Sequence, residues 1–206
     1  MTPTTELVAA REATARMRAL VDGIDDLAAP SLLPGWNRTY VVAHIAGNAL
    51  GQIRMLRGAE RGEIADQYPG GAEGRAAEID DLARDPRAAV AALHRTADEL
   101  DAAWRDTTDW DAEARALGGA LIPVWRIPWI RWREVEVHAV DLAAGYRPAD
   151  WPAEFVRRLL AELREWPACP PLDGITGPDH ALAAWLSGRS AGEDLQGDRP
   201  DLPEWR

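Results

Sequence analysis

The sequence contains no lysine, a single phenylalanine and a single cysteine among its 206 residues. The lone Cys169 excludes an internal disulfide, and because it lies in a proline-rich segment we interpret it as an incidental thiol. No apolar run approaches the ~20 residues that a membrane-spanning helix needs. The N-terminus also lacks the basic-then-apolar pattern of a signal peptide. These absences predict a cytoplasmic protein that does not associate with a membrane.

The charge of the chain is strongly biased toward the acidic side. All 23 basic residues are arginine, and they face 34 acidic residues, for a net charge of −11. The phosphate backbone repels such a chain, so we do not expect a nucleic acid partner. Hydrophobic residues make up 47% of the sequence, which at this length is enough to build a sizeable core.

Apolar residues recur with helical spacing over most of the chain and predict a mainly α protein. The predicted long helices span residues 4–28, 40–57, 87–104 and 128–144, with a short helical lead-in over 76–83. Helices of this length with moderate connections indicate a four-helix bundle over residues 1–147. Residues 148–206 are expected to form a small α(+β) appendix, with helices over about 153–166 and 178–187 and an acidic tail.

The candidate site begins with Glu134 and His138, which lie four residues apart and therefore share one helical face. His44 lies on the second predicted helix, near Gly47 and Gly51. Each internal glycine costs about 1 kcal/mol relative to alanine, which predicts close approach of a ligand or a neighbouring helix. Facing helices of a bundle commonly build metal sites, and three such ligands leave coordination positions open. Zn²⁺ is the best candidate, although the ligands also suit Fe²⁺, Ni²⁺ or Mn²⁺.

The residues alone leave other interpretations open. The E-x-x-x-H spacing also occurs in exposed helical pairs, and His44 and His138 could simply pack in a core that binds no metal. Asp141 is expected either to orient His138 or to pair with an arginine. Glu136 is expected to pair with Arg133 on the surface of the helix.

Two segments resemble a known family. LPGWNRTYVVAHIAGNA (33–49) and REVEVHAVDL (133–142) are similar to the mycothiol-dependent maleylpyruvate isomerase family, whose N-terminal part is a DinB-like four-helix bundle. The resemblance covers residues 1–150 and implies that His44, Glu134 and His138 bind a divalent metal, usually zinc. The family is actinobacterial, which agrees with the all-arginine, alanine-rich composition.

The resemblance implies a metal-dependent enzyme that uses mycothiol as cosubstrate. A metal-bound thiolate, rather than a protein nucleophile, would attack an electrophilic small molecule. The enzyme would be either a maleylpyruvate-type cis–trans isomerase or a thiol S-transferase, and its reaction product would distinguish the two. The alternative is a non-catalytic metal- or ligand-binding module. The expected partners are the electrophile and the thiol, and the expected assembly is a monomer or homodimer.

Several side chains are candidates for binding the substrate or the thiol: Asn48, Arg54, Arg126 and Arg131. An arginine can hold a carboxylate through two parallel hydrogen bonds, although a surface ion pair is the alternative for each of them. In the family, an arginine of a longer C-terminal α/β domain binds the substrate carboxylates. Arg189 is the candidate here, and the C-terminal region is expected to be shortened.

Overall fold

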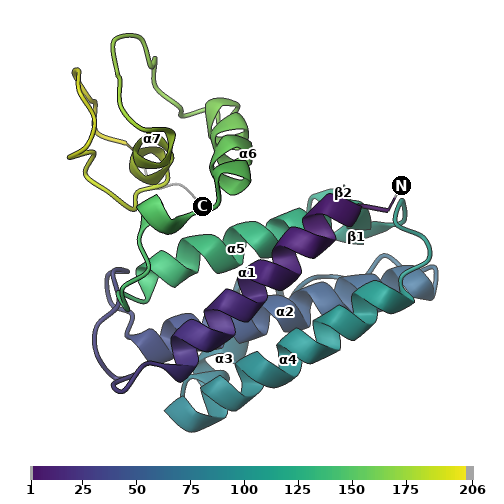
Figure 1. Cartoon of the computed structure of the whole chain (residues 1–206). Coiled ribbons are helices and arrows are strands. Elements are labelled where there is room, and N and C mark those ends of the chain that lie inside the picture. Colours follow the sequence, from purple (N-terminus) through teal and green to yellow (C-terminus); the bar gives the residue numbers. More distant parts are fainter. Residues whose placement is uncertain (1, 203–206) are drawn as a thin grey trace. The chain divides into compact units, whose positions relative to one another are not determined.

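The computed structural model describes residues 2–202 and divides the chain into two compact units, Met1–Ala144 and Gly145–Arg206 (Figure 1). The described residues are mainly helical, as the apolar periodicity predicted. None of their helices is long and apolar enough to cross a membrane.

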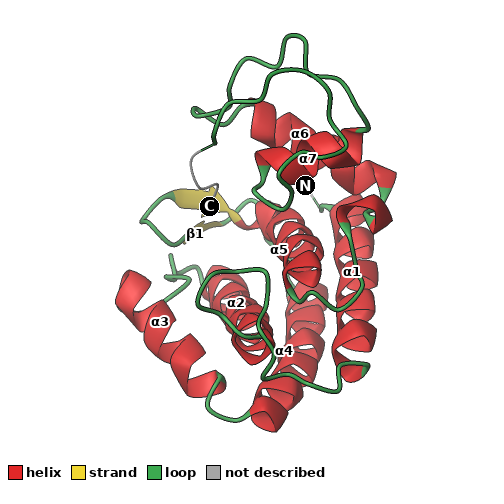
Figure 2. Cartoon of the chain, turned by 90° about the vertical axis from the view of Figure 1, so that its left-hand side faces the viewer, coloured by secondary structure: helices red, strands yellow, loops and turns green. Residues whose placement is uncertain are grey.

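The first unit is a four-helix bundle. Its long helices are α1 (Thr4–Asp22), α2 (Arg38–Glu60), α4 (Pro86–Asp106) and α5 (Ile127–Asp141). Helix α2 packs mainly on α4, and α1 mainly on α5, while the shorter α3 (Gly71–Leu82) lies against α2 (Figure 2). Neighbours therefore surround α2, and its side chains are buried on nearly every face. A histidine on such a helix is held in the interior rather than at the surface.

A short hairpin precedes α5. Strand β1 (Glu113–Arg115) pairs antiparallel with β2 (Leu121–Pro123), and the 3₁₀ helix η1 (Val124–Arg126) leads directly into α5. Proline has no N–H to donate to a sheet, which explains why Pro123 ends its strand.

The second unit contains η2 (Pro148–Asp150), α6 (Ala153–Arg164) and α7 (Asp179–Leu186). Helices α6 and α7 pack on each other, and an isolated antiparallel bridge pairs Thr176 with Gln196. The apolar face of α6 is buried and supplies most of this small core: Phe155, Val156, Leu159, Leu160 and Leu163.

Some helix ends differ from the prediction. Helix α1 ends at Asp22 rather than at residue 28, because the Asp26 carboxylate accepts hydrogen bonds from the backbone N–H groups of residues 28 and 29 and forms a turn. Helix α3 is longer than the predicted lead-in and begins at Gly71. Gly70 and Gly71 have φ angles of 79° and 64°, a conformation that only glycine adopts readily, so this start has no strong sequence signal.

Candidate metal centre

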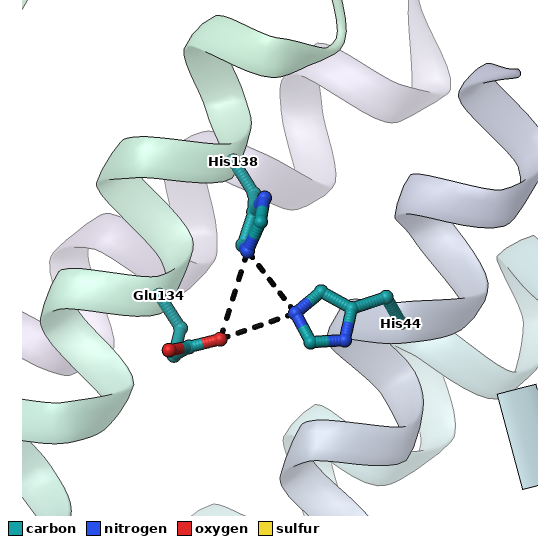
Figure 3. Close-up of side chains that lie close together, drawn as sticks. All are labelled: His44, Glu134 and His138. Atoms are coloured by element: carbon teal, nitrogen blue, oxygen red, sulfur yellow. Dashed lines mark hydrogen bonds and ion pairs between the residues drawn. The ribbon is translucent and has the colours of Figure 1, made fainter. Parts of the chain in front are cut away.

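Two facing helices bring the three predicted ligands together (Figure 3). His44 lies in the second turn of α2, whose start is fixed by Asn37, because the Asn37 side chain accepts a hydrogen bond from the backbone N–H of Tyr40. Glu134 and His138 lie one turn apart on α5 and point toward His44. The side chains of the three residues are only 4%, 20% and 13% exposed, respectively.

The donor atoms form a small triangle. His44 Nε2 lies 3.1 Å from Glu134 Oε2 and 3.0 Å from His138 Nε2, and the third side, from His138 Nε2 to Glu134 Oε2, is 3.7 Å. A tetrahedral Zn²⁺ with bonds of about 2.0–2.1 Å would hold its ligand atoms about 3.3–3.4 Å apart. The triangle therefore has the size that a divalent cation requires, and its donor set of two imidazoles and a carboxylate suits zinc or a similar transition metal.

Asp141 contacts the far side of the His138 ring. His138 Nδ1 lies 2.8 Å from Asp141 Oδ2, and the aspartate is 1% exposed. A carboxylate there accepts the Nδ1 proton and leaves the Nε2 lone pair directed at the triangle. Of the two roles expected for Asp141, the contact with His138 is thus present.

The surroundings set the charges of the candidate ligands. Burial, together with His138, lowers the pKa of His44 to about 4, so its ring is neutral at neutral pH. Burial alone would raise the pKa of Glu134, but the hydrogen bond from His44 and the nearby His138 and Arg133 outweigh it and lower that pKa. A neutral imidazole and an ionised carboxylate are the forms that coordinate a cation.

The glycines of α2 give room to the segment that follows it. A Cβ at Gly51 would lie 2.8 Å from Gln67 Cγ and 3.4 Å from Tyr68 Cζ, and one at Gly47 would touch Ile79 of α3 at 3.6 Å. The close neighbours of these glycines are therefore α3 and the segment that leads into it. Gly51 allows Tyr68 to lie directly on the α2 backbone.

Arg75, on α3, is a neighbour of the site that the sequence did not indicate. Its Nη2 lies 3.1 Å from His44 Nδ1, and its guanidinium is a hydrogen-bonding neighbour of the Tyr68 hydroxyl. On the α2 side of the site, the Trp36 ring meets the edge of His44 with ring centroids 5.6 Å apart. No sequence pattern pointed to Arg75, because it follows a glycine-rich segment and lies 31 residues after His44.

Arg131, one of the predicted candidates for binding the substrate or the thiol, is fully buried. Its Nη1 donates to the backbone carbonyl of Ile45 at 2.8 Å and to Asn48 Oδ1 at 3.1 Å. Asn48 also accepts a hydrogen bond from Gln52. Burial lowers the pKa of Arg131 to about 10, opposed by the carboxylate of Glu134. The predicted pair of binding residues is therefore engaged in an internal polar network between α2 and α5.

The other predicted arginines have different surroundings. Arg54 forms an ion pair with Glu78 of α3 and donates to the Gln67 carbonyl at 3.0 Å, so it ties α2 to α3 and the segment before it. Arg126 is exposed in η1. Arg189 belongs to the second unit, where its Nη1 donates to the Ser187 carbonyl at 2.6 Å.

Glu136 is not a surface residue, and this expectation was wrong. It is 1% exposed and accepts a hydrogen bond from Trp132 Nε1 at 3.3 Å. It also forms an ion pair with Arg16 of α1. The reason is topological, since α1 covers the face of α5 opposite the ligands and brings Arg16 to this carboxylate. Glu134 and Glu136 thus serve two different faces of one helix.

The fold and the site define a helical-bundle protein with a candidate centre of two histidines and one carboxylate. Residues 10–143 match the family model described as the mycothiol maleylpyruvate isomerase N-terminal domain, and the chain belongs to this family. The matched residues include all three members of the triangle.

Solved structures of a family member extend the similarity to the second unit. A crystal structure of the mycothiol-dependent maleylpyruvate isomerase matches with a TM-score of 0.91 and 27% sequence identity, over 100% of this chain and 98% of that chain. A histidine-to-alanine mutant of that isomerase matches with a TM-score of 0.90 and the same identity and coverage. No curated protein sequence matches significantly. Against these isomerases the chain is not shortened, which removes the reason to expect a reduced C-terminal region.

Proposed function

We propose that the protein is a metal- and mycothiol-dependent cis–trans isomerase of maleylpyruvate or a closely related cis-enoyl dicarboxylate. The observation that carries the proposal is the convergence of His44, Glu134 and His138 at ligand spacing inside the matched family region. The near-complete coverage of the solved isomerases supports isomerase over S-transferase chemistry. We place the reaction in the cytoplasm, where low-molecular-weight thiols stay reduced.

Each residue of the centre has a defined task in this proposal. His44, Glu134 and His138 would hold the cation, for which we propose Zn²⁺, and Asp141 fixes the tautomer and orientation of His138. A divalent cation bound there would lower the pKa of a coordinating thiol and make its sulfur nucleophilic near neutral pH.

The reaction needs no nucleophile from the chain. The thiol sulfur adds to one carbon of the cis double bond, and the electron pair moves onto the adjacent carbonyl as an enolate. The former double bond is now a single bond and can rotate. Return of the electron pair expels the sulfur, restores the double bond in the trans form and regenerates the thiol. Atoms and charge balance without an oxidant or a reductant.

The test compares two histidine variants of the purified protein. Bound metal and mycothiol-dependent isomerisation of maleylpyruvate are measured for the wild type, His44→Ala and His94→Ala. His94 is the matched control because it contacts Arg18 and Asp22 between α1 and α4, on another face of the bundle. We expect His44→Ala to lose both metal and activity, and His94→Ala to keep both. A wild type without stoichiometric metal would overturn the proposal.

The same assay distinguishes the other candidate functions. An S-transferase would consume one thiol for each substrate molecule and form a stable conjugate, whereas an isomerase returns the thiol. A non-catalytic module would bind metal and show no turnover with any thiol. A thermal-shift measurement with metal and with thiol separates this last case from an enzyme that lacks its correct substrate.

A further inference from the structure

Arg75 is a charged side chain that pairs with no carboxylate in the described part of the chain. It is half-buried on α3, and among residues 2–202 it forms no ion pair. Two other arginines near the site have acidic partners, since Arg54 pairs with Glu78 and Arg133 lies 3.7 Å from Glu134. The buried Arg131 donates to the Ile45 carbonyl and to Asn48. A partly desolvated guanidinium normally finds an anion, because burying an unpaired charge is unfavourable. Arg75 instead contacts an imidazole and a phenol.

The contact with His44 is incompatible with a metal on that ring. Arginine only donates, so His44 Nδ1 must accept from Arg75 Nη2 and the ring proton must lie on Nε2. Nε2 is the atom that faces Glu134 and His138. Coordination through Nε2 requires the other tautomer, whose Nδ1–H would point at the Arg75 N–H. With a cation in the site, Arg75 therefore loses this acceptor and its guanidinium becomes available to an anion.

Tyr68 adds a second hydrogen-bond donor at the same place. Burial and the nearby Glu134 raise the pKa of Tyr68 to about 12, so its hydroxyl keeps its proton at neutral pH. Because Gly51 has no side chain, the Tyr68 ring lies against α2, the helix that carries His44. A guanidinium and a neutral phenol side by side form a donor pair suited to a carboxylate.

We propose that Arg75, together with the Tyr68 hydroxyl, binds a carboxylate of the substrate beside the metal centre. The inference rests on the proposed function for the nature of the substrate and names the side chains that select a dicarboxylate. Arg75 is then a substrate-binding residue supplied by the bundle itself. The arginine contact that the family resemblance assigns to the C-terminal part would serve a different carboxylate.

The experiment measures binding of maleate, a cis-dicarboxylate, to the zinc-loaded full chain by calorimetry in the absence of thiol. The variants are Arg75→Gln, Arg75→Lys, Tyr68→Phe and, as matched control, Arg84→Gln. Arg84 is an exposed residue just after α3 that pairs with Asp81. We expect Arg75→Gln to weaken binding by about ten- to a hundredfold, the range for loss of a charged hydrogen bond. Arg75→Lys should restore part of the affinity, Tyr68→Phe should weaken it severalfold, and Arg84→Gln should match the wild type.

Zinc content, measured on the same samples, should be stoichiometric in every variant. The inference is overturned if Arg75→Gln binds maleate within twofold of the wild type, or if the zinc-loaded wild type does not bind maleate. Should Arg75→Gln not fold, Arg75→Lys and Tyr68→Phe decide by the same criterion. Because no thiol is present, these results are independent of thiol-dependent turnover, whose absence would count against the proposed function and not against this inference. In an active enzyme, Arg75→Gln should raise KM for the dicarboxylate and leave KM for mycothiol unchanged.

Discussion

At the scale of single residues, Glu134 and Glu136 show how two carboxylates on one helix acquire separate tasks. Glu134 faces the two histidines, and Glu136 faces Arg16 of α1. Glu134→Gln should lower metal affinity by more than about a hundredfold and should also destabilise the metal-free protein at neutral pH, because the fold lowers the pKa of this carboxylate. Glu136→Gln should cost about 1–3 kcal/mol of stability, less than a fully buried pair because Arg16 is 41% exposed, and leave metal affinity unchanged. Urea unfolding measures the stability of each variant, and competition with a chelator measures its metal affinity. A loss of metal affinity in Glu136→Gln but not in Glu134→Gln would contradict the assignment.

The buried imidazole of His44 predicts how the metal-free protein responds to acid. Its pKa falls from 6.5 to about 4 on folding, so between these values the unfolded chain binds a proton that the folded chain does not. The free energy of unfolding therefore decreases as the pH falls from 6.5 toward 4, by on the order of 3 kcal/mol from this residue. The contribution of Glu134, whose pKa is also lowered, is lost only at more acidic pH, below its ordinary value of 4.5.

Urea unfolding of the chelated protein at several pH values measures this effect. His44→Gln carries no titrating group at this position and should show a shallower slope between pH 6.5 and 4. An unchanged slope in the variant would assign the acid sensitivity to other residues.

The convergence of the candidate ligands could be predicted from sequence because each lies within a strongly periodic helix, and Glu134 and His138 share a face by spacing alone. The surroundings of Glu136 and Arg131 could not be predicted, because helical spacing gives the face of a residue but not the helix that covers it. Arg75 was missed for a related reason, since the start of α3 depends on Gly70 and Gly71 in left-handed conformations.

At the scale of elements, the two glycines of α2 should respond in opposite ways to alanine. A Cβ at Gly47 would meet Ile79 at 3.6 Å, an ordinary contact, so Gly47→Ala should gain up to about 1 kcal/mol from helix propensity. A Cβ at Gly51 would lie 3.1 Å from the Gln67 carbonyl oxygen and 2.8 Å from its Cγ. Gly51→Ala should therefore cost about 1–2 kcal/mol net, because overpacking outweighs the propensity gain.

The two substituted positions lie one helical turn apart on α2. Thermal and urea unfolding of the two variants test the expected difference in stability. Gly51→Ala should also weaken maleate binding if it displaces Tyr68, whereas Gly47→Ala should not. Equal stabilities of the two variants would mean that the segment before α3 moves away without cost.

At the scale of the whole molecule, the candidate ligands all lie in the first of the two units. A cation bound only to the folded state stabilises that unit by about 2.7 kcal/mol when its free concentration is a hundred times Kd. Adding a chelator should therefore increase amide hydrogen exchange in residues 4–141, which include the bundle helices, and leave α6 and α7 unchanged. Exchange that is the same with and without the chelator would favour the interpretation in which the histidines only pack in the core.

The bundle could be predicted from sequence more fully than the second unit. The predicted helices of the bundle have long apolar stripes, whereas residues 165–178 and 187–202 have little regular structure and are organised by turns and a single bridge. Local periodicity carries no information about such segments. The prediction of a shortened C-terminal region came from these segments. Their similarity to the solved isomerases lies in the three-dimensional arrangement and not in a sequence pattern.

The edge-to-face contact between Trp36 and His44 gives the centre its own fluorophore. An indole whose ring centroid lies 5.6 Å from that of the His44 imidazole senses the electronic state of that ring, so its emission should change when a cation binds. Paramagnetic Cu²⁺ or Ni²⁺ should quench this indole far more than diamagnetic Zn²⁺ does. Replacing Trp36 by phenylalanine would identify its signal among the ten tryptophans. Occupancy of the centre can therefore be followed in the unlabelled protein, in real time and separately from catalysis.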